Sequence, residues 1–425
     1  VAAEVKFSQP ERYSKIRLPH IHSWAPVYFN YDNVESISGD DYYKTASLGA
    51  TAIFQNLLST CYGMVGYGAH EDPYKDGDWR HSGHFKYIFT GLWPVIEFSA
   101  DFNDRAAMDI QKIQVSKGKM YRLYNKGTLT DKPYFEGGLK VYIPFNFSSG
   151  GINRGLIPQV KYKFTNDRYN DQILFQHIVK KDGKDVTETY STIGENNISP
   201  LQTLDASIRG YVMRQKAPSQ VFPSLGFGAE LGFHFRPGHM KAYNPTAYLY
   251  TYGYLPGFTA RQGLRLTASM EVWYGPYEEG GIMEGALTAI PRGFVDTNLK
   301  SIINSCSESR WRVTADYAIP FADVDWSFLS PVAYVKNFEL TPFFDWSYQT
   351  FSWNHELHYN PGAVTGENLF SVGADLTVNL GNFFWLPYDT QIGIRYARNF
   401  WHYIDRFPIS NLNKDYFGWI FSISL

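Results

Sequence analysis

Apolar and polar residues alternate with a period of two along much of this chain, and this pattern limits the possible fold more than any other feature. In the stretch 225–236, Phe227 and Phe233 fall on one parity while Glu230 and His234 fall on the other. A helix repeats its apolar positions every 3.6 residues, whereas a strand repeats them every two. The pattern therefore predicts a strand with one apolar face and one polar face.

About sixteen segments alternate in this way, and together they predict an all-β chain. The expected strands cover 23–31, 47–54, 61–67, 84–89, 95–102, 134–143, 155–164, 201–213, 225–236, 245–254, 264–273, 311–317, 338–347, 370–380, 388–397 and 415–425.

The connections between these strands alternate in length. Segments 55–60 and 91–94 are short, whereas 103–132 and 165–200 are long. An even number of strands, with short turns on one rim and long loops on the other, is typical of outer-membrane β-barrels. A soluble β-sandwich, the competing interpretation, also alternates along its strands but has no reason to alternate its loop lengths.

The composition favours membrane-spanning strands over a membrane-spanning helix. The sequence has no run of about 18 apolar residues, whereas a barrel strand needs only about 9 to 11 and exposes half of them to lipid. We expect a transmembrane antiparallel β-barrel over residues 22–425, preceded by a connector on the periplasmic side over residues 1–21. The chain begins at Val1, which we interpret as the start of a processed or truncated product.

Aromatic residues make up 17% of the chain, and those near strand ends fit the aromatic girdles of a membrane barrel. These residues are Trp93, Trp326, Trp385, Tyr388 and Trp401. The net charge of −2 gives no electrostatic basis for binding nucleic acid.

The candidate site is a loop tip, Pro291-Arg292-Gly293-Phe294, between the strands at 264–273 and 311–317. Asp316 and Asp345 lie on the polar faces of the next two strands. An arginine stays charged at any working pH, and its planar fork can meet two carboxylates. Gly293 permits a tight turn, and Phe294 can pack against the wall. We expect the loop to fold inward and be pinned; the alternative is an arginine in solvent.

These motifs resemble those of the Omp85 superfamily, sixteen-stranded outer-membrane barrels that assemble or translocate other proteins. The family carries Arg-Gly-Phe or Arg-Gly-Tyr in its sixth extracellular loop, and here Arg292, Gly293 and Phe294 follow the eleventh expected strand. The resemblance extends to Asp316 before Ile319-Pro320-Phe321 and to Phe343-Phe344-Asp345 on the next strand. It implies that Arg292 contacts both acids. The opening region resembles barrel starts of Bacteroidetes outer-membrane proteins.

The resemblance implies a location in the outer membrane of a Gram-negative bacterium and a role in inserting or translocating polypeptides. Such a mechanism would use a weakly paired seam between the first and last strands, because unpaired strand edges accept a client strand. The expected seam residues are Pro26, Val27, Phe29, Phe417, Gly418 and Trp419. The expected partners are outer-membrane lipid, client polypeptides, and a periplasmic module or lipoprotein.

Two other functions remain open: a passive channel or transporter, and a barrel that anchors a periplasmic or surface partner. We expect no enzyme, because the sequence lacks a nucleophile elbow, a Walker loop and a zinc-protease motif. No cofactor or metal is expected either. His20 and His22 have no evident third ligand, and Cys61 and Cys306 are expected to be unpaired. A second Arg-Gly-aromatic motif begins at Arg209, but it lies within an expected strand.

Overall fold

The computed structural model describes most of the chain, with gaps mainly at the longer connections. The described residues are 20–30, 46–72, 77–113, 125–170, 173–181, 184–193, 198–217, 220–237, 245–273, 290–294, 307–327, 333–351, 365–382, 389–401 and 413–424. Within them all regular structure is β. No helix in these ranges is long and apolar enough to cross a membrane.

Nineteen strands lie in these ranges. They are β1 (His20–Phe29), β2 (Ala46–Gln55), β3 (Cys61–Glu71), β4 (Trp79–Phe89), β5 (Val95–Ile113), β6 (Asn125–Tyr142), β7 (Phe145–Asn146), β8 (Ile152–Asn170), β9 (Ile173–Lys181), β10 (Lys184–Ile193), β11 (Ile198–Arg214), β12 (Gly226–Phe235), β13 (Thr246–Pro256), β14 (Gly263–Trp273), β15 (Ser307–Trp326), β16 (Tyr334–Phe351), β17 (Thr365–Gly381), β18 (Asp389–Trp401) and β19 (Asp415–Ser424).

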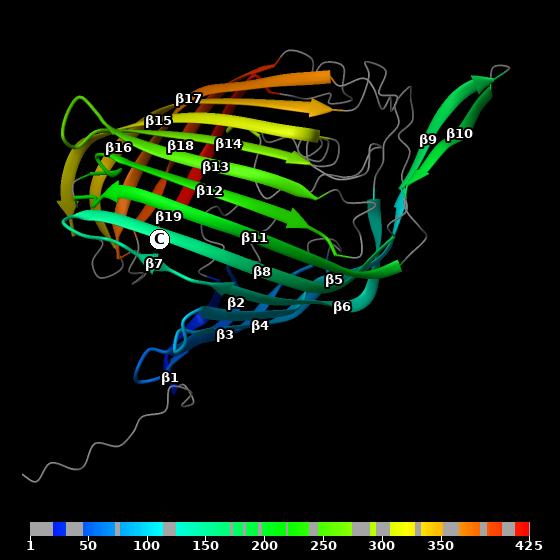
Figure 1. The fold of residues 1–425 in the computed structure, drawn as a ribbon, viewed down its shortest axis with the longest axis horizontal. Helices are drawn as coiled ribbons and strands as arrows, with labels where there is room; N and C mark the ends of the chain where they lie inside the picture. Colours follow the sequence, from blue (N-terminus) through cyan, green and yellow to red (C-terminus); the bar gives the residue numbers. More distant parts are fainter. Residues whose placement is uncertain are drawn as a thin grey trace, which may run out of the picture.

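Seventeen strands form one antiparallel sheet, and β9 and β10 form a separate hairpin. Without the two-residue β7, sixteen full-length strands remain. Each pairs with its neighbour in the chain, from β1–β2 to β18–β19, with β8 joining β6 to β11. The sheet curls, so that β16–β19 pass behind β8, β11 and β12 (Figure 1). The predicted all-β barrel fold and its strand number are confirmed.

Several strands are longer than the sequence predicts, because β-bulges interrupt the alternation without ending the pairing. β15 continues past Tyr317 to Trp326, and its register shifts between Pro320 and Ala322 and again between Asp323 and Trp326. A bulge adds a residue to one strand and moves later side chains to the other face. Alternation alone therefore places the strand end too early.

Two other expectations differ from the structure. β1 begins at His20, whereas the sequence analysis starts the first strand at residue 23. The segment 165–200, which the sequence analysis assigns to a loop, contains the rest of β8 and the β9–β10 hairpin. This hairpin projects away from the sheet (Figure 1). Among the described residues, its two strands pair with each other and with no strand of the large sheet.

The two faces of the sheet have inverted polarity compared with a soluble protein. On β16, Asp345 and Glu339 are 0% and 3% exposed, whereas Phe344 and Leu340 are 41% and 37% exposed. β12 shows the same order, with Phe227 exposed on the outer face. Polar side chains thus line the interior and apolar ones cover the outside. A continuous apolar exterior of this kind fits an apolar solvent.

Successive connections fall alternately on the two rims. Segments 56–60 and 90–94 lie on one rim, and the long connection 274–306 lies on the other. The alternation in length is not uniform, since 215–225 on the short rim is as long as 236–245 on the long rim. The candidate loop therefore starts from the rim that carries the longest connections.

Candidate functional site

The loop tip at 290–294 is buried inside the sheet. Ile290 is 8% and Phe294 is 3% exposed. The tip is a tight turn in which the Phe294 amide donates to the Pro291 carbonyl at 3.4 Å. Gly293 has a φ of 95°, in the region that favours glycine. The loop connecting β14 to β15 therefore turns inward at this motif.

Arg292 is held mainly by Asp345. Its backbone amide donates to Asp345 Oδ2 at 2.8 Å, its Nε donates to the same oxygen at 2.9 Å, and its Nη2 donates to Oδ1 at 2.5 Å. The second ion pair joins Nη1 to Asp316 Oδ1 at 2.6 Å. A bidentate pair fixes both the direction and the position of the guanidinium. One arginine thus ties the loop to β15 and β16 together.

The arginine lies on an aromatic platform. The guanidinium carbon of Arg292 is 3.9 Å from the centroid of the Phe343 ring, and that of Arg395 is 5.5 Å from the same ring. Phe343 points inward and is 4% exposed. The ring has room because Gly373 lies beside it on β17: a Cβ there would be 2.7 Å from the ring. The face of the Phe343 ring adds a cation–π attraction to the guanidinium of Arg292.

Two further arginines pair with the two acids. Arg265 on β14 donates to Asp316 Oδ2 at 3.1 and 2.9 Å, because the register places these residues opposite each other. Arg312 donates to Asp345 Oδ2 at 3.3 Å. Each buried carboxylate is therefore shared by two guanidinium groups. Buried charges are stable only when paired and hydrogen-bonded in this way.

Electrostatics keep Arg292 charged. Burial lowers the pKa of its guanidinium, but the hydrogen bonds and negative charges of Asp345 and Asp316 raise it by more, so the pKa lies above its ordinary value. The contact is therefore a permanent ion pair over the working pH range. The contacts described here between Arg292, Asp316 and Asp345 are ion pairs and hydrogen bonds that hold the loop.

The rest of the loop tip contacts β18. Asn399 on β18 donates from Nδ2 to the Gly293 carbonyl at 2.9 Å. The ring of Phe294 meets that of Trp401 edge-to-face, with centroids 6.2 Å apart. Trp401 therefore packs against the loop and not at a membrane interface as expected, because the inward loop places an aromatic partner beside it.

The structure brings Arg292, Gly293, Phe294, Asp316 and Asp345 together at one place on the interior wall. The sequence analysis did not identify Asn399, Arg312 or the other arginines. Phe343 was quoted only as part of a motif, yet an aromatic residue between Thr341 and Asp345 on a polar face could have indicated a platform. The Arg209 motif stays on β11, where its Nη2 donates to Tyr252 Oη at 3.2 Å.

The first and last strands are the second candidate region. β1 pairs with β2 and β19 with β18, and the described residues give no register between β1 and β19. The register of β1 shifts between Ala25 and Val27, which places Pro26 in a bulge, the position where a strand tolerates proline. Val27, Phe417 and Trp419 are 40%, 74% and 86% exposed. Phe29 and Gly418 are part-exposed.

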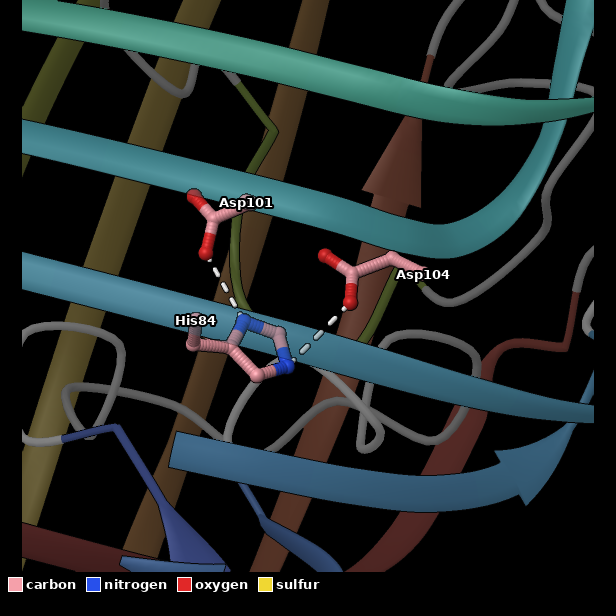
Figure 2. A group of neighbouring side chains, drawn as sticks. All are labelled: His84, Asp101 and Asp104. Carbon is pink, nitrogen blue, oxygen red and sulfur yellow. Dashed lines mark hydrogen bonds and ion pairs between the residues drawn. The ribbon is translucent and has the colours of Figure 1, made fainter. Parts of the chain in front are cut away.

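A third group of side chains faces the interior near β1. His84 on β4 lies between two carboxylates of β5: Nδ1 is 2.8 Å from Asp101 Oδ1 and Nε2 is 3.3 Å from Asp104 Oδ1 (Figure 2). The buried Tyr28 ring stacks on the imidazole at 3.8 Å. The three side chains are close enough to hold a cation. The two carboxylates, however, lie at opposite ends of the ring, one beside Nδ1 and the other beside Nε2. This geometry fits two separate contacts to the imidazole better than one coordination sphere.

The histidine pair His20 and His22, at which no metal is expected, and Cys61 lie outside these sites. His22 Nδ1 hydrogen-bonds to Ser23 Oγ at 3.0 Å, on an exposed part of β1. Cys61 is buried and its Sγ accepts a hydrogen bond from Tyr87 Oη at 3.2 Å. Cys306 lies outside the described residues, as do Trp385 and Tyr388.

The fold and this site together define an antiparallel sixteen-stranded barrel whose interior holds a loop tip by buried ion pairs. No protein-family model and no curated protein matches the sequence. Among solved structures, the chain is similar to BamA from Haemophilus ducreyi lacking POTRA domains 1–3. The identity is 12%, the TM-score is 0.40, and the match covers 92% of this chain and 69% of that chain.

Proposed function

We propose that the chain is an outer-membrane barrel of the Omp85 type, in a Gram-negative bacterium, that inserts or translocates other polypeptides. The proposal includes no catalytic step, no cofactor and no nucleic acid. Its partners would be membrane lipid, client polypeptides in extended form, and a lipoprotein or periplasmic module. The observation that carries it is the seam: within the described residues, β1 and β19 share no register.

An open seam gives a physical route for the activity. The edge of a strand presents a row of N–H and C=O groups that can pair with another strand. A client strand could add to β1 by β-augmentation, as extended peptides add to sheet edges elsewhere. The bulge at Pro26 favours this step because it weakens continuous pairing along β1.

The pinned loop supplies the second part of the mechanism. Its tip is tied to β15 and β16 through Arg292 and to β18 through Asn399. That part of the wall then stays rigid while the seam opens. A loop inside the lumen also obstructs free passage, which distinguishes this arrangement from an open pore.

Site-specific photocrosslinking tests the proposal. The full chain is reconstituted in liposomes with a photoreactive phenylalanine in place of Trp24 on β1 or Trp419 on β19, which are 71% and 86% exposed, and a urea-unfolded outer-membrane barrel is added as client. Trp311, which is 41% exposed on the outer face of β15, serves as the matched control position. We expect crosslinks to the client from Trp24 and Trp419 only. Equal crosslinking from all three positions would show that the client merely adheres to apolar surface.

Planar-bilayer recordings separate this function from a passive channel. The proposal predicts low conductance for the wild-type chain and higher conductance for Arg292→Ala, because the released loop tip no longer occupies the lumen. A passive channel would conduct steadily in both forms. Recovery of a tightly bound lipoprotein with no client crosslink would instead favour a barrel that anchors a partner.

A further inference from the structure

A row of charged side chains crosses the interior wall on the strands β5, β6, β8 and β11. The registers place Glu97 opposite Lys140, Lys140 opposite Lys161, and Lys161 opposite Asp205. The wall thus sets two lysines directly against each other on adjacent strands. Like charges in opposite positions destabilise a sheet, so such a pair needs a compensating anion.

The carboxylates nearby are already engaged. Glu97 lies 3.2 Å from Lys86 and 3.9 Å from Lys140, so Lys140 has the weaker share. Asp205 is paired with His234 on β12. Among the described residues, no carboxylate forms an ion pair with Lys161. Lys161, at the centre of the row, therefore has Asp205 opposite it in register but no carboxylate within ion-pair distance among the described residues.

The lysines face a cavity and do not fill it. A space of about 520 Å³ is lined by five cationic side chains and three carboxylates. Lys163, the third lysine, also faces this space, and its Nζ is 2.5 Å from Glu136. Lys140, Lys161 and Lys163 line an adjoining cavity of about 310 Å³ as well. These volumes match those of small-molecule sites.

We propose that Lys140, Lys161 and Lys163 form an anion site for a phosphate group in the lumen. An ammonium group is a compact charge with three donors, so three of them can surround a tetrahedral phosphate. The arginines of the loop site instead match planar carboxylates. Gln159 and Ser207, which are hydrogen-bonded to each other at 2.8 Å, supply neutral polar contacts at the cavity edge. The ligand is either free phosphate or the phosphate of a small organic ester.

Calorimetric titration of the full chain in detergent micelles tests this site. The ligands are inorganic phosphate and glycerol 3-phosphate, each at constant ionic strength set with sodium chloride. We expect Lys161→Gln to weaken binding about tenfold, the loss of one charge-assisted hydrogen bond, and Lys161→Arg to weaken it less. Lys132→Gln removes an exposed lysine outside both cavities and should leave binding unchanged.

Thermal unfolding, measured with and without phosphate, distinguishes a ligand-binding role of Lys161 from a purely structural one. Without phosphate, Lys161→Gln should unfold at the same temperature as wild type or higher, because the opposed charges are relieved. With phosphate, only the wild type and Lys161→Arg should gain stability. Tighter binding of the ester than of inorganic phosphate would identify an organic ligand, and equal binding would identify free phosphate. The proposal is overturned if neither ligand binds, or if Lys161→Gln binds both like wild type.

Discussion

The wall formed by β14–β18 and the wall formed by β5, β6, β8 and β11 (the β5–β11 wall) both line the interior with charged side chains, but their charges are paired differently. On the first wall, Asp316 and Asp345 are each shared by two arginines and are almost fully buried. On the second, Lys140 and Lys161 oppose each other beside open space. A network in which every carboxylate is paired, such as that of Asp316 and Asp345 (the closed network), suits a permanent contact within the chain. An unbalanced one suits a ligand that comes and goes.

The largest effect is expected from breaking the closed network at its centre. Asp345→Asn keeps the shape of the side chain but leaves Arg292 and Arg312 without their shared carboxylate. Removing one partner of a buried ion pair costs about 3–5 kcal/mol of unfolding free energy. Urea unfolding of the protein in micelles, followed by tryptophan fluorescence, measures this loss.

Asp415→Asn is the matched control for this change. Its pair with Arg398, at 3.5 Å, is about half exposed on both sides. Surface pairs contribute about 1 kcal/mol or less. If the two variants lost equal stability, the network around Arg292 would be no stronger than a surface contact, and the comparison of the two walls would fail.

The second effect concerns how closely the loop tip approaches the wall. In Gly293→Ala, the new Cβ would lie 2.7 Å from Asn399 Oδ1 and 2.8 Å from Ala397 Cβ, on a backbone with φ of 95°. Strain at positive φ alone costs about 1–3 kcal/mol. We expect a loss near the upper end of this range, measured by the same unfolding assay.

Gly77→Ala isolates the contribution of the close approach. Gly77 has a similar φ of 82°, but nothing lies within 4 Å of its added Cβ. This control therefore carries the conformational strain without the collision. A loss in Gly293→Ala no greater than in Gly77→Ala would mean that the tip can move off the wall at little cost.

Much of the fold follows from sequence because side-chain parity depends only on local chain geometry. The alternation of Glu339, Asp345 and Phe344 fixes which face each one occupies on β16, and the structure agrees. The strand ends are less predictable, because bulges such as the one at Pro320 change parity within a strand. The β9–β10 hairpin lies in the segment 165–200, where the sequence analysis identified no strict alternation of apolar and polar residues.

The site was only partly predictable, for a different physical reason. The alternation of the sequence predicts which face of the sheet Arg265 and Asp316 occupy. It does not predict that they lie opposite each other, because the register between neighbouring strands depends on their tilt. The same applies to Lys140 on β6 and Lys161 on β8, whose opposite positions depend on the register of these two strands. Only the motif at Arg292 carried information about a contact between distant segments.

The third prediction tests the aromatic platform under the arginine. Phe343→Leu removes the ring face 3.9 Å from Arg292 while keeping an apolar side chain. A desolvated cation–π contact contributes about 2 kcal/mol, so we expect a loss of this size. Phe344→Leu, one residue on and facing outward, is the control, and its loss should be under about 1 kcal/mol because the side chain is 41% exposed. A larger loss from Phe344→Leu would assign the stability to the exterior surface.

The smallest effect is expected at the other Arg-Gly-aromatic motif, on the wall that lacks a closed network. Arg209 on β11 lies opposite Glu230 in register but forms no ion pair with it among the described residues; it donates to Tyr252 Oη and lies 5.6 Å from that ring. An exposed cation–π contact contributes about 0.5–1 kcal/mol, so Arg209→Ala should lower stability by no more than this and leave conductance unchanged. Comparing Arg209→Ala with Arg292→Ala shows whether stability depends on the Arg-Gly-aromatic motif itself or on the burial of its arginine against two acids. A large loss from Arg209→Ala would place a second fixed point on the β5–β11 wall and remove the contrast between the walls.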